Sequence, residues 1–171
     1  MFKIALETPA DADGIEDLLD SAFGPGRKAK VVYGLRQEVP ALARLCFTGW
    51  LDGSLIATLR FWAVQAGGRP LLLLGPIAVR PDLQGKGYGI ALLEHGLAEA
   101  RAQGWPAVAL VGDEPYYARV GFSRAAAEAL HLPGLAQPER LLARELEAGG
   151  LAALAGAIGP AVGQARCVRA A

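Results

Sequence analysis

The sequence lacks an excess of either charge, because its 17 Lys and Arg residues are matched by 17 Asp and Glu residues. A nucleic-acid-binding protein that relies on a broad electrostatic surface would be more basic. A polybasic segment suited to an anionic membrane surface is also missing from the sequence. We therefore expect neither nucleic acid nor membrane among its partners.

Long hydrophobic runs and clustered cysteines are absent as well. The chain reaches Glu7 without the apolar stretch of a signal peptide. Residues 148–163 are uncharged but mostly Ala and Gly, which favours a small-residue helix and loop over a membrane span. Cys46 and Cys167 are isolated and lack metal-ligand spacing, so they predict plain thiols and no metal site. These absences predict a cytoplasmic protein.

Apolar and small residues are what the chain has in quantity. Of its 171 residues, 53% are hydrophobic and 20% are charged, and 22 are glycines. A chain near 150 residues is typical of one domain and buries roughly 70% of its unfolded surface. The sequence therefore predicts a single domain over residues 1–171.

Apolar periodicity predicts a mixed α/β sheet, with strands dominating the first half and alternating with helices in the second. Asp52-Gly53 is a strong hairpin signal between two of the strands. The expected strands cover residues 2–8, 41–51, 54–65, 71–79, 105–111 and 140–146, with a further strand starting at Gly121. The expected helices cover residues 11–23, 27–37, 87–103 and 114–120.

The expected strand 71–79 contains an anomaly. Its continuous apolar run suits a central strand that is covered on both faces. Pro76 has no N–H to donate, and a central strand normally excludes proline except at a bulge. Gly75-Pro76 therefore predicts either a local break in the pairing or a strand that is simply shorter.

A glycine-rich loop lies between this strand and the next helix. Gly85, Gly87 and Gly89 alternate there, so the backbone can approach a ligand without obstruction by a Cβ atom. The first turn of a helix has unpaired N–H groups and a partial positive charge, and Lys86 adds a mobile cation. Together these features predict a phosphate site, although neither a Walker A nor a dinucleotide spacing fits the loop.

Two blocks of residues resemble the GNAT superfamily of N-acetyltransferases. Gln84, Gly87 and Gly89 fill its acetyl-CoA-binding pattern, Arg/Gln-x-x-Gly-x-Gly/Ala. Residues 116–122, Tyr-Tyr-Ala-Arg-Val-Gly-Phe, resemble its Tyr-x-x-x-Gly-Phe signature, and the doubled tyrosine is most similar to a bacterial subgroup. The close match covers residues 71–122.

The resemblance implies the GNAT fold, a mixed and mostly antiparallel central sheet of about seven strands, splayed between strands 4 and 5 and flanked by helices. Gly75-Pro76 falls where this family has a bulge in the fourth strand. The implied co-substrate is acetyl-CoA, whose pantetheine arm enters the gap between the strands. The residues that the resemblance assigns to CoA are Ile77, Ala78, Val79, Gln84, Gly85, Lys86, Gly87, Tyr88, Gly89 and Arg119, the last facing either a CoA phosphate or solvent.

The resemblance also places Tyr117 where the family commonly has a general acid beside the CoA sulfur, although a tyrosine that only packs at a helix end fits the same position. No general base is identified, because residues 72–79 contain no carboxylate. Asp113 and Glu114 are explained more simply as a helix cap and a first-turn acid. Ordered water together with backbone carbonyls could equally act as the general base.

The expected activity is acetyl transfer to an amine of a small molecule, by direct attack in a ternary complex, since neither motif contains a cysteine. A protein N-terminus or lysine as acceptor stays open, and so does a CoA-binding module without catalysis. The acceptor is expected to be selected by residues 23–39, the hairpin near Asp52 and the segment after Phe122. The protein is expected to act as a monomer or homodimer.

Overall fold

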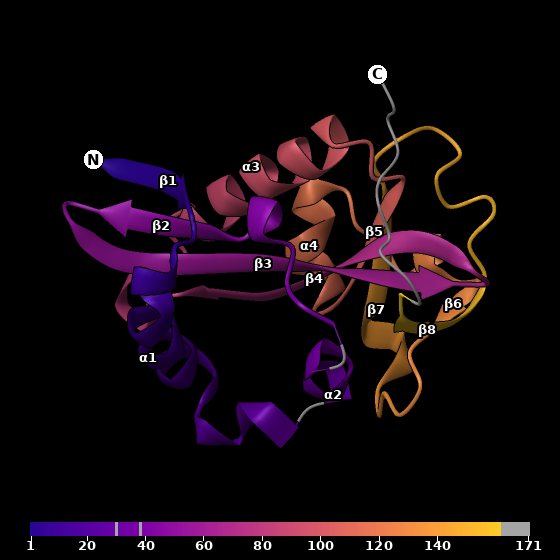
Figure 1. Cartoon of the computed structure of the whole chain (residues 1–171), viewed down its shortest axis with the longest axis horizontal. Helices are drawn as coiled ribbons and strands as arrows, with labels where there is room; N and C mark the ends of the chain where they lie inside the picture. The colour runs from indigo at the N-terminus through magenta and orange to yellow at the C-terminus, as the bar shows by residue number, and fades with distance from the viewer. Residues whose placement is uncertain (30, 38, 162–171) are drawn as a thin grey trace.

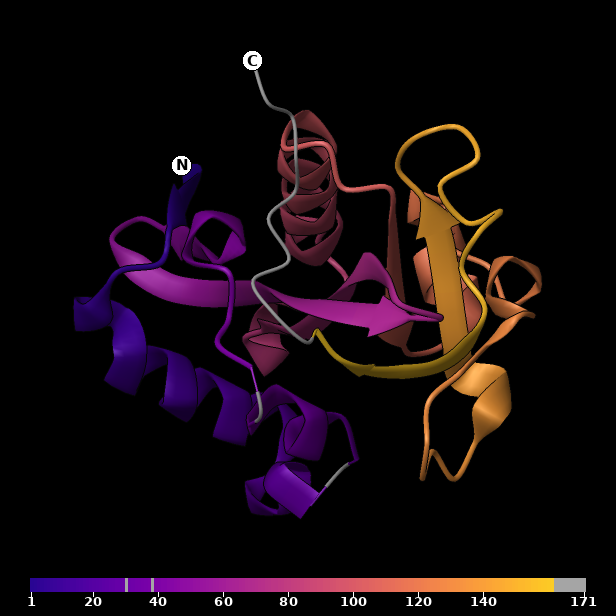
Figure 2. The same ribbon diagram turned by 45° about the vertical axis from the view of Figure 1, so that its right-hand side comes forward.

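An 8-stranded sheet with helices on both faces forms the protein (Figure 1). The computed structural model describes residues 1–29, 31–37 and 39–161. Figures 1 and 2 place α3 on one face of the sheet, and α1 and α2 on the other. The helices are α1 (Ala12–Phe23), α2 (Val31–Gln37), α3 (Tyr88–Ala102) and α4 (Glu114–Tyr117). The strands are β1 (Phe2–Leu6), β2 (Phe47–Leu51), β3 (Ser54–Ala66), β4 (Arg69–Val79), β5 (Ala107–Val111), β6 (Leu130–His131), β7 (Leu141–Glu145) and β8 (Gly156–Pro160).

The strands follow the order β1-β2-β3-β4-β5-β7, and β8 pairs with both β3 and β6. Along the main path only β4 and β5 are parallel, and the other neighbours are antiparallel. The expectation of a mixed, mostly antiparallel sheet is therefore confirmed, with eight strands in place of about seven.

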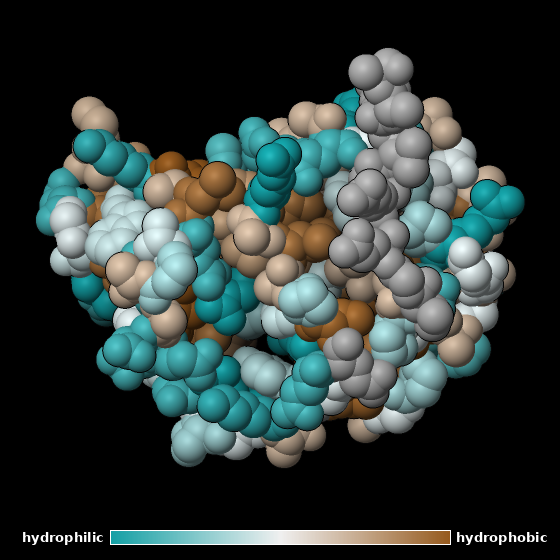
Figure 3. All heavy atoms as spheres, in the orientation of Figure 1, coloured by the Kyte–Doolittle hydropathy of each residue, from teal (hydrophilic) through white to brown (hydrophobic). Residues whose placement is uncertain are grey.

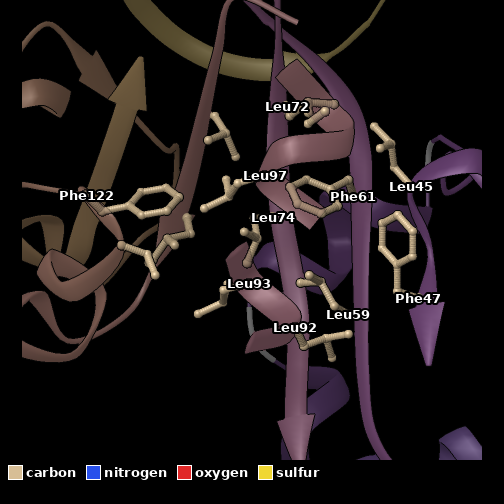
Figure 4. Packing of buried hydrophobic residues seen from close by; sticks show 14 of the residues in the cluster. Leu45, Phe47, Leu59, Phe61, Leu72, Leu74, Leu92, Leu93, Leu97 and Phe122 are labelled. Atoms are coloured by element: carbon tan, nitrogen blue, oxygen red, sulfur yellow. The ribbon is translucent and has the colours of Figure 1, made fainter. Parts of the chain in front are cut away.

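Strand β4 is buried on both faces, as its continuous apolar run predicts. Leu72 and Leu74 belong to a cluster that includes Leu93 and Leu97 of α3, and Figure 4 shows these side chains between the strand and the helix. The alternate residues Leu71 and Leu73 belong to a second cluster on the other face. Burying a leucine completely contributes roughly 1.5–3 kcal/mol, so this strand anchors both layers.

The pairing of β3 with β4 is interrupted at Gly75-Pro76. Leu59 pairs with Ile77 and Phe61 with Leu74, so two residues of β4 stand opposite Arg60 alone. The peptide bond between Gly75 and Pro76 is cis. The predicted break in the pairing is confirmed as a bulge within a longer strand.

Strands β4 and β5 pair at only two positions, Leu72 with Val108 and Leu73 with Ala109. Beyond Leu73 the two strands separate, and the edge of β4 that faces β5 has no strand partner there. The expected splay between the fourth and fifth strands is therefore confirmed.

Two predicted strands are wrong in extent. The strand expected over residues 41–51 begins only at Phe47, because a 3-10 turn at Ala43–Leu45 brings Leu45 into the core. The strand expected from Gly121 is reduced to one bridge between Ser123 and Ala143. The hydroxyl of Ser123 accepts a hydrogen bond from the N–H of Ala126 (3.1 Å), which starts a turn instead.

Two further expectations need correction. The helix expected over residues 27–37 is divided into a 3-10 turn, Pro25–Ala29, and α2, because the buried side chain of Arg27 ties that turn back to α1. The tail expected as a helix and loop over residues 148–163 contains strand β8 up to residue 160. Positions 162 and 163 and Cys167 lie outside the described residues, within which no helix is long and apolar enough to cross a membrane.

Candidate active site

A cavity of about 1120 Å³ opens where β4 and β5 separate. Its walls are Leu74–Val79 of β4, residues 110–112 after the paired part of β5, and the glycine loop that precedes α3. Helix α2 and residues 134–137 border the opposite side. Figure 3, in the orientation of Figure 1, shows a narrow hollow below the centre of the molecule, with mostly hydrophilic residues along its lower edge.

The fold brings every predicted site residue except Lys86 to this cavity. Lys86 is exposed and does not line it. The predicted residues that line the cavity are Ile77, Ala78, Val79, Gln84, Gly85, Gly87, Tyr88, Gly89, Tyr117 and Arg119, and Tyr116 lies beside them.

The glycine loop at the cavity wall leads into a helix whose first backbone N–H groups have no helical acceptor. Gly85 and Gly87 have φ angles of 76° and 91°, in the left-handed region that favours glycine. The first hydrogen bond of α3 runs from the N–H of Ala91 to the carbonyl of Gly87 (3.0 Å). The N–H groups of residues 88–90 therefore have no acceptor within the helix, and they form the positive end of its dipole.

Gln84 connects this loop to the end of β4. Its side-chain Nε2 donates to the carbonyl of Val79 (3.1 Å). The side chain thus holds the loop against the strand, and its backbone remains beside the cavity. A loop fixed at both ends is suited to hold an anion because its N–H groups need no reordering on binding.

Tyr117 is enclosed by other rings at the end of the cavity near β5. Its ring lies edge-on to Tyr116 at 5.0 Å and to Phe122 at 6.1 Å between centroids. Burial raises the pKa of Tyr117 to about 12, so that its hydroxyl carries a proton at neutral pH. Tyr116 is more exposed, and Arg119 lies over its ring at 5.9 Å.

The only carboxylate among the described residues that line the cavity is Asp113. It occupies the N-cap position of α4, but its side chain makes no capping hydrogen bond. It pairs instead with Nη2 of Arg140 at 3.2 Å. The explanation of Asp113 as a helix cap is therefore wrong for its side chain. The carboxylate of Glu114 also points elsewhere, because it accepts a hydrogen bond from the N–H of Arg124.

Two α2 residues that line the cavity, and a tryptophan bonded to its wall, were not found from the motifs. Arg36 and Tyr33 reach the cavity from α2, and Nε1 of Trp62 donates to the carbonyl of Gly75 (2.5 Å) at its wall. Only the broad assignment of residues 23–39 to acceptor selection included the two α2 residues. Their meeting with Trp62 depends on how α2 lies over the bulge, for which the sequence contains no signal.

Comparisons with known proteins agree with this geometry. Residues 12–122 match the acetyltransferase (GNAT) family. The N-acetyltransferase YhbS of Escherichia coli is 34% identical over 125 residues, which cover 72% of this chain and 74% of YhbS. The chain therefore belongs to the GNAT acetyltransferase family, and it is an N-acetyltransferase by class.

Two solved structures extend the likeness to the whole fold. A crystal structure of YhbS from E. coli in complex with CoA has a TM-score of 0.79 and 27% identity, covering 93% of this chain and 89% of that one. A crystal structure of a GNAT acetyltransferase from Brucella melitensis in complex with acetyl-CoA has a TM-score of 0.62 and 30% identity, and the match covers 72% of this chain and 83% of that one. One relative thus holds acetyl-CoA, the co-substrate that the resemblance implied, and the other holds CoA. Within the described residues of this chain, no group of three or more His, Cys, Asp or Glu side chains could hold a metal ion.

Proposed function

We propose that this protein, acting as a single domain, transfers the acetyl group of acetyl-CoA to the amine of a small molecule by direct attack. The observation that carries the proposal is the opening between β4 and β5. Their pairing ends at Leu73 and Ala109, and the unpaired edge of β4 runs along the cavity toward the glycine loop. An extended chain with amide groups can add to such an edge as a strand would.

The cavity offers partners for each part of CoA. The backbone of Ile77, Ala78 and Val79 would pair with the amides of pantetheine. The backbone N–H groups of residues 84–89 would hold the pyrophosphate at the start of α3. Arg119, exposed at the rim, would face a CoA phosphate. The likeness to two relatives that bind CoA or acetyl-CoA supports this placement.

The chemistry needs a proton donor for the leaving sulfur, and Tyr117 has the properties required. The neutral amine attacks the thioester carbonyl carbon, the C–N bond forms, and the C–S bond breaks. Tyr117 donates its phenolic proton to the sulfur. The surplus proton of the amine passes to water, and the phenolate regains a proton from solvent. The high pKa of Tyr117 keeps it in the donating form.

The shape of the cavity favours a small acceptor over a protein. Helix α2 and the loop at residues 134–137 approach each other across it, since Cγ2 of Val31 lies 3.2 Å from the point where a Cβ of Gly134 would stand. A flexible protein tail would need this side of the cavity to be open. Two of the three segments expected to select the acceptor, residues 23–39 and the segment after Phe122, thus contribute to its outer wall, whereas the hairpin near Asp52 does not line the cavity.

The binding half of the proposal is tested by calorimetric titration with CoA. Gly87→Val should lose most of its CoA affinity, because a branched side chain at φ 91° distorts the loop. Gly68→Val is the matched control, since Gly68 also has a positive φ, 76°, and lies in a turn away from the cavity. Unchanged CoA affinity in Gly87→Val would contradict the placement of the pyrophosphate.

The chemical half is tested by the release of free CoA thiol across a panel of primary amines. Tyr117→Phe should lower kcat by roughly 10²-fold or more while CoA affinity is kept. A protein that binds acetyl-CoA but releases no thiol with any amine would be a binding module. A full rate in Tyr117→Phe would make Tyr117 a packing residue only.

A further inference from the structure

Arg36 reaches the cavity with part of its guanidinium unpaired. Its Nε is buried and has no hydrogen-bond partner among the described residues. Its Nη2 lies 2.6 Å from the point where a Cβ of Gly75 would stand, which places the guanidinium against the bulge of β4. Lacking a side chain, residue 75 leaves room for this approach.

The arginine on the neighbouring 3-10 turn has the opposite environment. Arg27 is only 2% exposed, but it donates to Asp20 (2.7 Å), Glu16 (2.6 Å) and the hydroxyl of Tyr33 (3.0 Å). These bonds raise the pKa of Arg27, although burial opposes the rise. Its charge is therefore neutralised within the protein, whereas the guanidinium of Arg36 has no carboxylate partner among the described residues.

The described groups around Arg36 are aromatic rings, which hold the guanidinium in place and carry no negative charge. Its guanidinium lies over the rings of Tyr33 at 5.1 Å and Trp62 at 5.9 Å. Burial lowers the pKa of Arg36 to about 10, and the positive charge of Arg60 acts in the same direction. An uncompensated buried cation is costly to stability, and aromatic faces offset only a part of that cost.

We propose that Arg36 binds a carboxylate of the acceptor, so that the substrate is a small amine that also carries a carboxylate group. A guanidinium presents a planar fork of N–H donors that matches a carboxylate. One unneutralised positive charge calls for one negative charge, which a carboxylate supplies. This inference rests on the proposed acetyl transfer, because the acceptor end of the cavity is defined by it.

The position of Arg36 also limits the length of the acceptor. Gly75 precedes Ile77, Ala78 and Val79 on the edge of β4, on the side away from the glycine loop. Pantetheine that extends from the loop along this edge ends with its sulfur toward Gly75. The carboxylate and the reacting amine would therefore be separated by a short spacer, as in an amino acid.

The experiment compares amino acids with their amides as acceptors. Glycine, β-alanine and γ-aminobutyrate are each tested against the corresponding amide, and kcat/KM is expressed per neutral amine because the carboxylate alters the amine pKa. For at least one spacer length the acid should exceed its amide by roughly 10- to 100-fold. Equal use of acid and amide at every length would overturn the proposal, and so would preference for an aminoalkylphosphonate of the same length.

Variants of α2 assign the preference to Arg36. Arg36→Met should bring the acid-to-amide ratio close to one, and Arg36→Lys should retain part of it because the charge remains but the fork is lost. Gln37→Ala, an exposed change on the same helix, should leave the ratio unchanged. A ratio that survives in Arg36→Met would overturn the proposal, whereas a merely structural role would change all acceptors alike.

Binding of the amino acids to the CoA-loaded protein, measured by calorimetry, separates the two levels of the argument. Carboxylate binding that depends on Arg36, with no thiol release from any amine, would contradict acetyl transfer but support the carboxylate site. Thiol release from amines with no dependence on the carboxylate would keep the proposed function and overturn the site. If neither carboxylate binding nor thiol release were observed, the carboxylate site and the proposed acetyl transfer would both be overturned.

Discussion

The hydroxyl of Tyr116 lies 2.6 Å from the point where a Cβ of Gly89 would stand. Helix α3 and helix α4 therefore approach each other at the cavity only because residue 89 has no side chain. A methyl group there also comes within 3.3 Å of Cγ2 of Val79 on β4. The glycine of the motif thus allows strand, loop and tyrosine to meet around the CoA pyrophosphate position that we propose.

Gly89→Ala should weaken CoA binding by about tenfold or more, because Tyr116 or the loop must move. Adding Tyr116→Phe removes the clashing oxygen and should restore part of the affinity. Calorimetric titration with CoA measures both. Gly26→Ala serves as control, since no atom lies within 4 Å of the added carbon there. Wild-type affinity in Gly89→Ala would show that the close approach has no bearing on CoA.

Gly112→Ala should impair catalysis more than binding. A Cβ at residue 112 would overlap the ring of Tyr117, so the ring must shift away from its place near the end of β5. Loss of a positioned proton donor lowers kcat by about 10²-fold, while the loop to which we assign CoA binding is untouched. Steady-state kinetics and CoA titration test this. A fall in CoA affinity with kcat preserved would contradict the role assigned to Tyr117.

The rate of the reaction should increase with pH on the alkaline side. It should not decline at any pH below about 11. A proton donor acts only below its own pKa, and burial places that of Tyr117 at about 12. The neutral fraction of an acceptor amine with a pKa of about 10 increases through the same range. The rate of thiol release with a saturating amine over pH 7–11 provides the measurement. A decline with a midpoint near pH 9 would contradict Tyr117 as the acid.

The ion pair of Glu7 and Arg60 should contribute measurably to stability. Arg60 donates to both carboxylate oxygens of Glu7, at 2.7 and 2.6 Å, and both side chains are less than a fifth exposed. Glu7→Gln leaves the cation without its partner, so the free energy of unfolding should fall by about 2–3 kcal/mol. Urea denaturation measures the change. Asp82→Asn breaks the exposed pair with Arg80 and should have no detectable effect.

Arg36→Met should stabilise the protein even as it changes acceptor selection. Removing the unpaired charge relieves its desolvation cost, and the loss of its contacts with aromatic rings offsets only a part. We expect a gain of about 1 kcal/mol, which raises Tm by roughly 2–4 °C in a domain of this size. Thermal denaturation without ligand checks this. A lower Tm in this variant, with Gln37→Ala unchanged, would mean that the charge is satisfied in the folded protein.

The features found from the sequence are those that depend on a residue's own conformational limits. A proline cannot donate in a strand, so Gly75-Pro76 indicated the bulge before its partners were known. Alternating glycines before a helix indicated the loop that lines the cavity, with positive φ angles at Gly85 and Gly87. The resemblance of the two blocks then supplied the splay and the position of Tyr117.

The errors lie where partners decide the conformation. Strand β8 contains mostly small residues with little preference for a strand. It forms because β3 is longer than β2, which leaves Val64–Ala66 without a partner on that edge until β8 pairs there. A local sequence pattern cannot predict that this edge of β3 lacks a partner, since β3 and β8 are far apart in the chain.

The amino-acid sequence by itself determined the family and indicated the loop that we assign to CoA, because a glycine loop at a helix start carries its chemistry in its backbone. Only the tertiary structure decided which side chains border the end of the cavity that we assign to the acceptor. Arg36 is one of several basic residues until α2 lies over the bulge and places its partly buried guanidinium beside Trp62 at the cavity. An unsatisfied charge is a property of the surroundings, and those surroundings exist only in the folded protein.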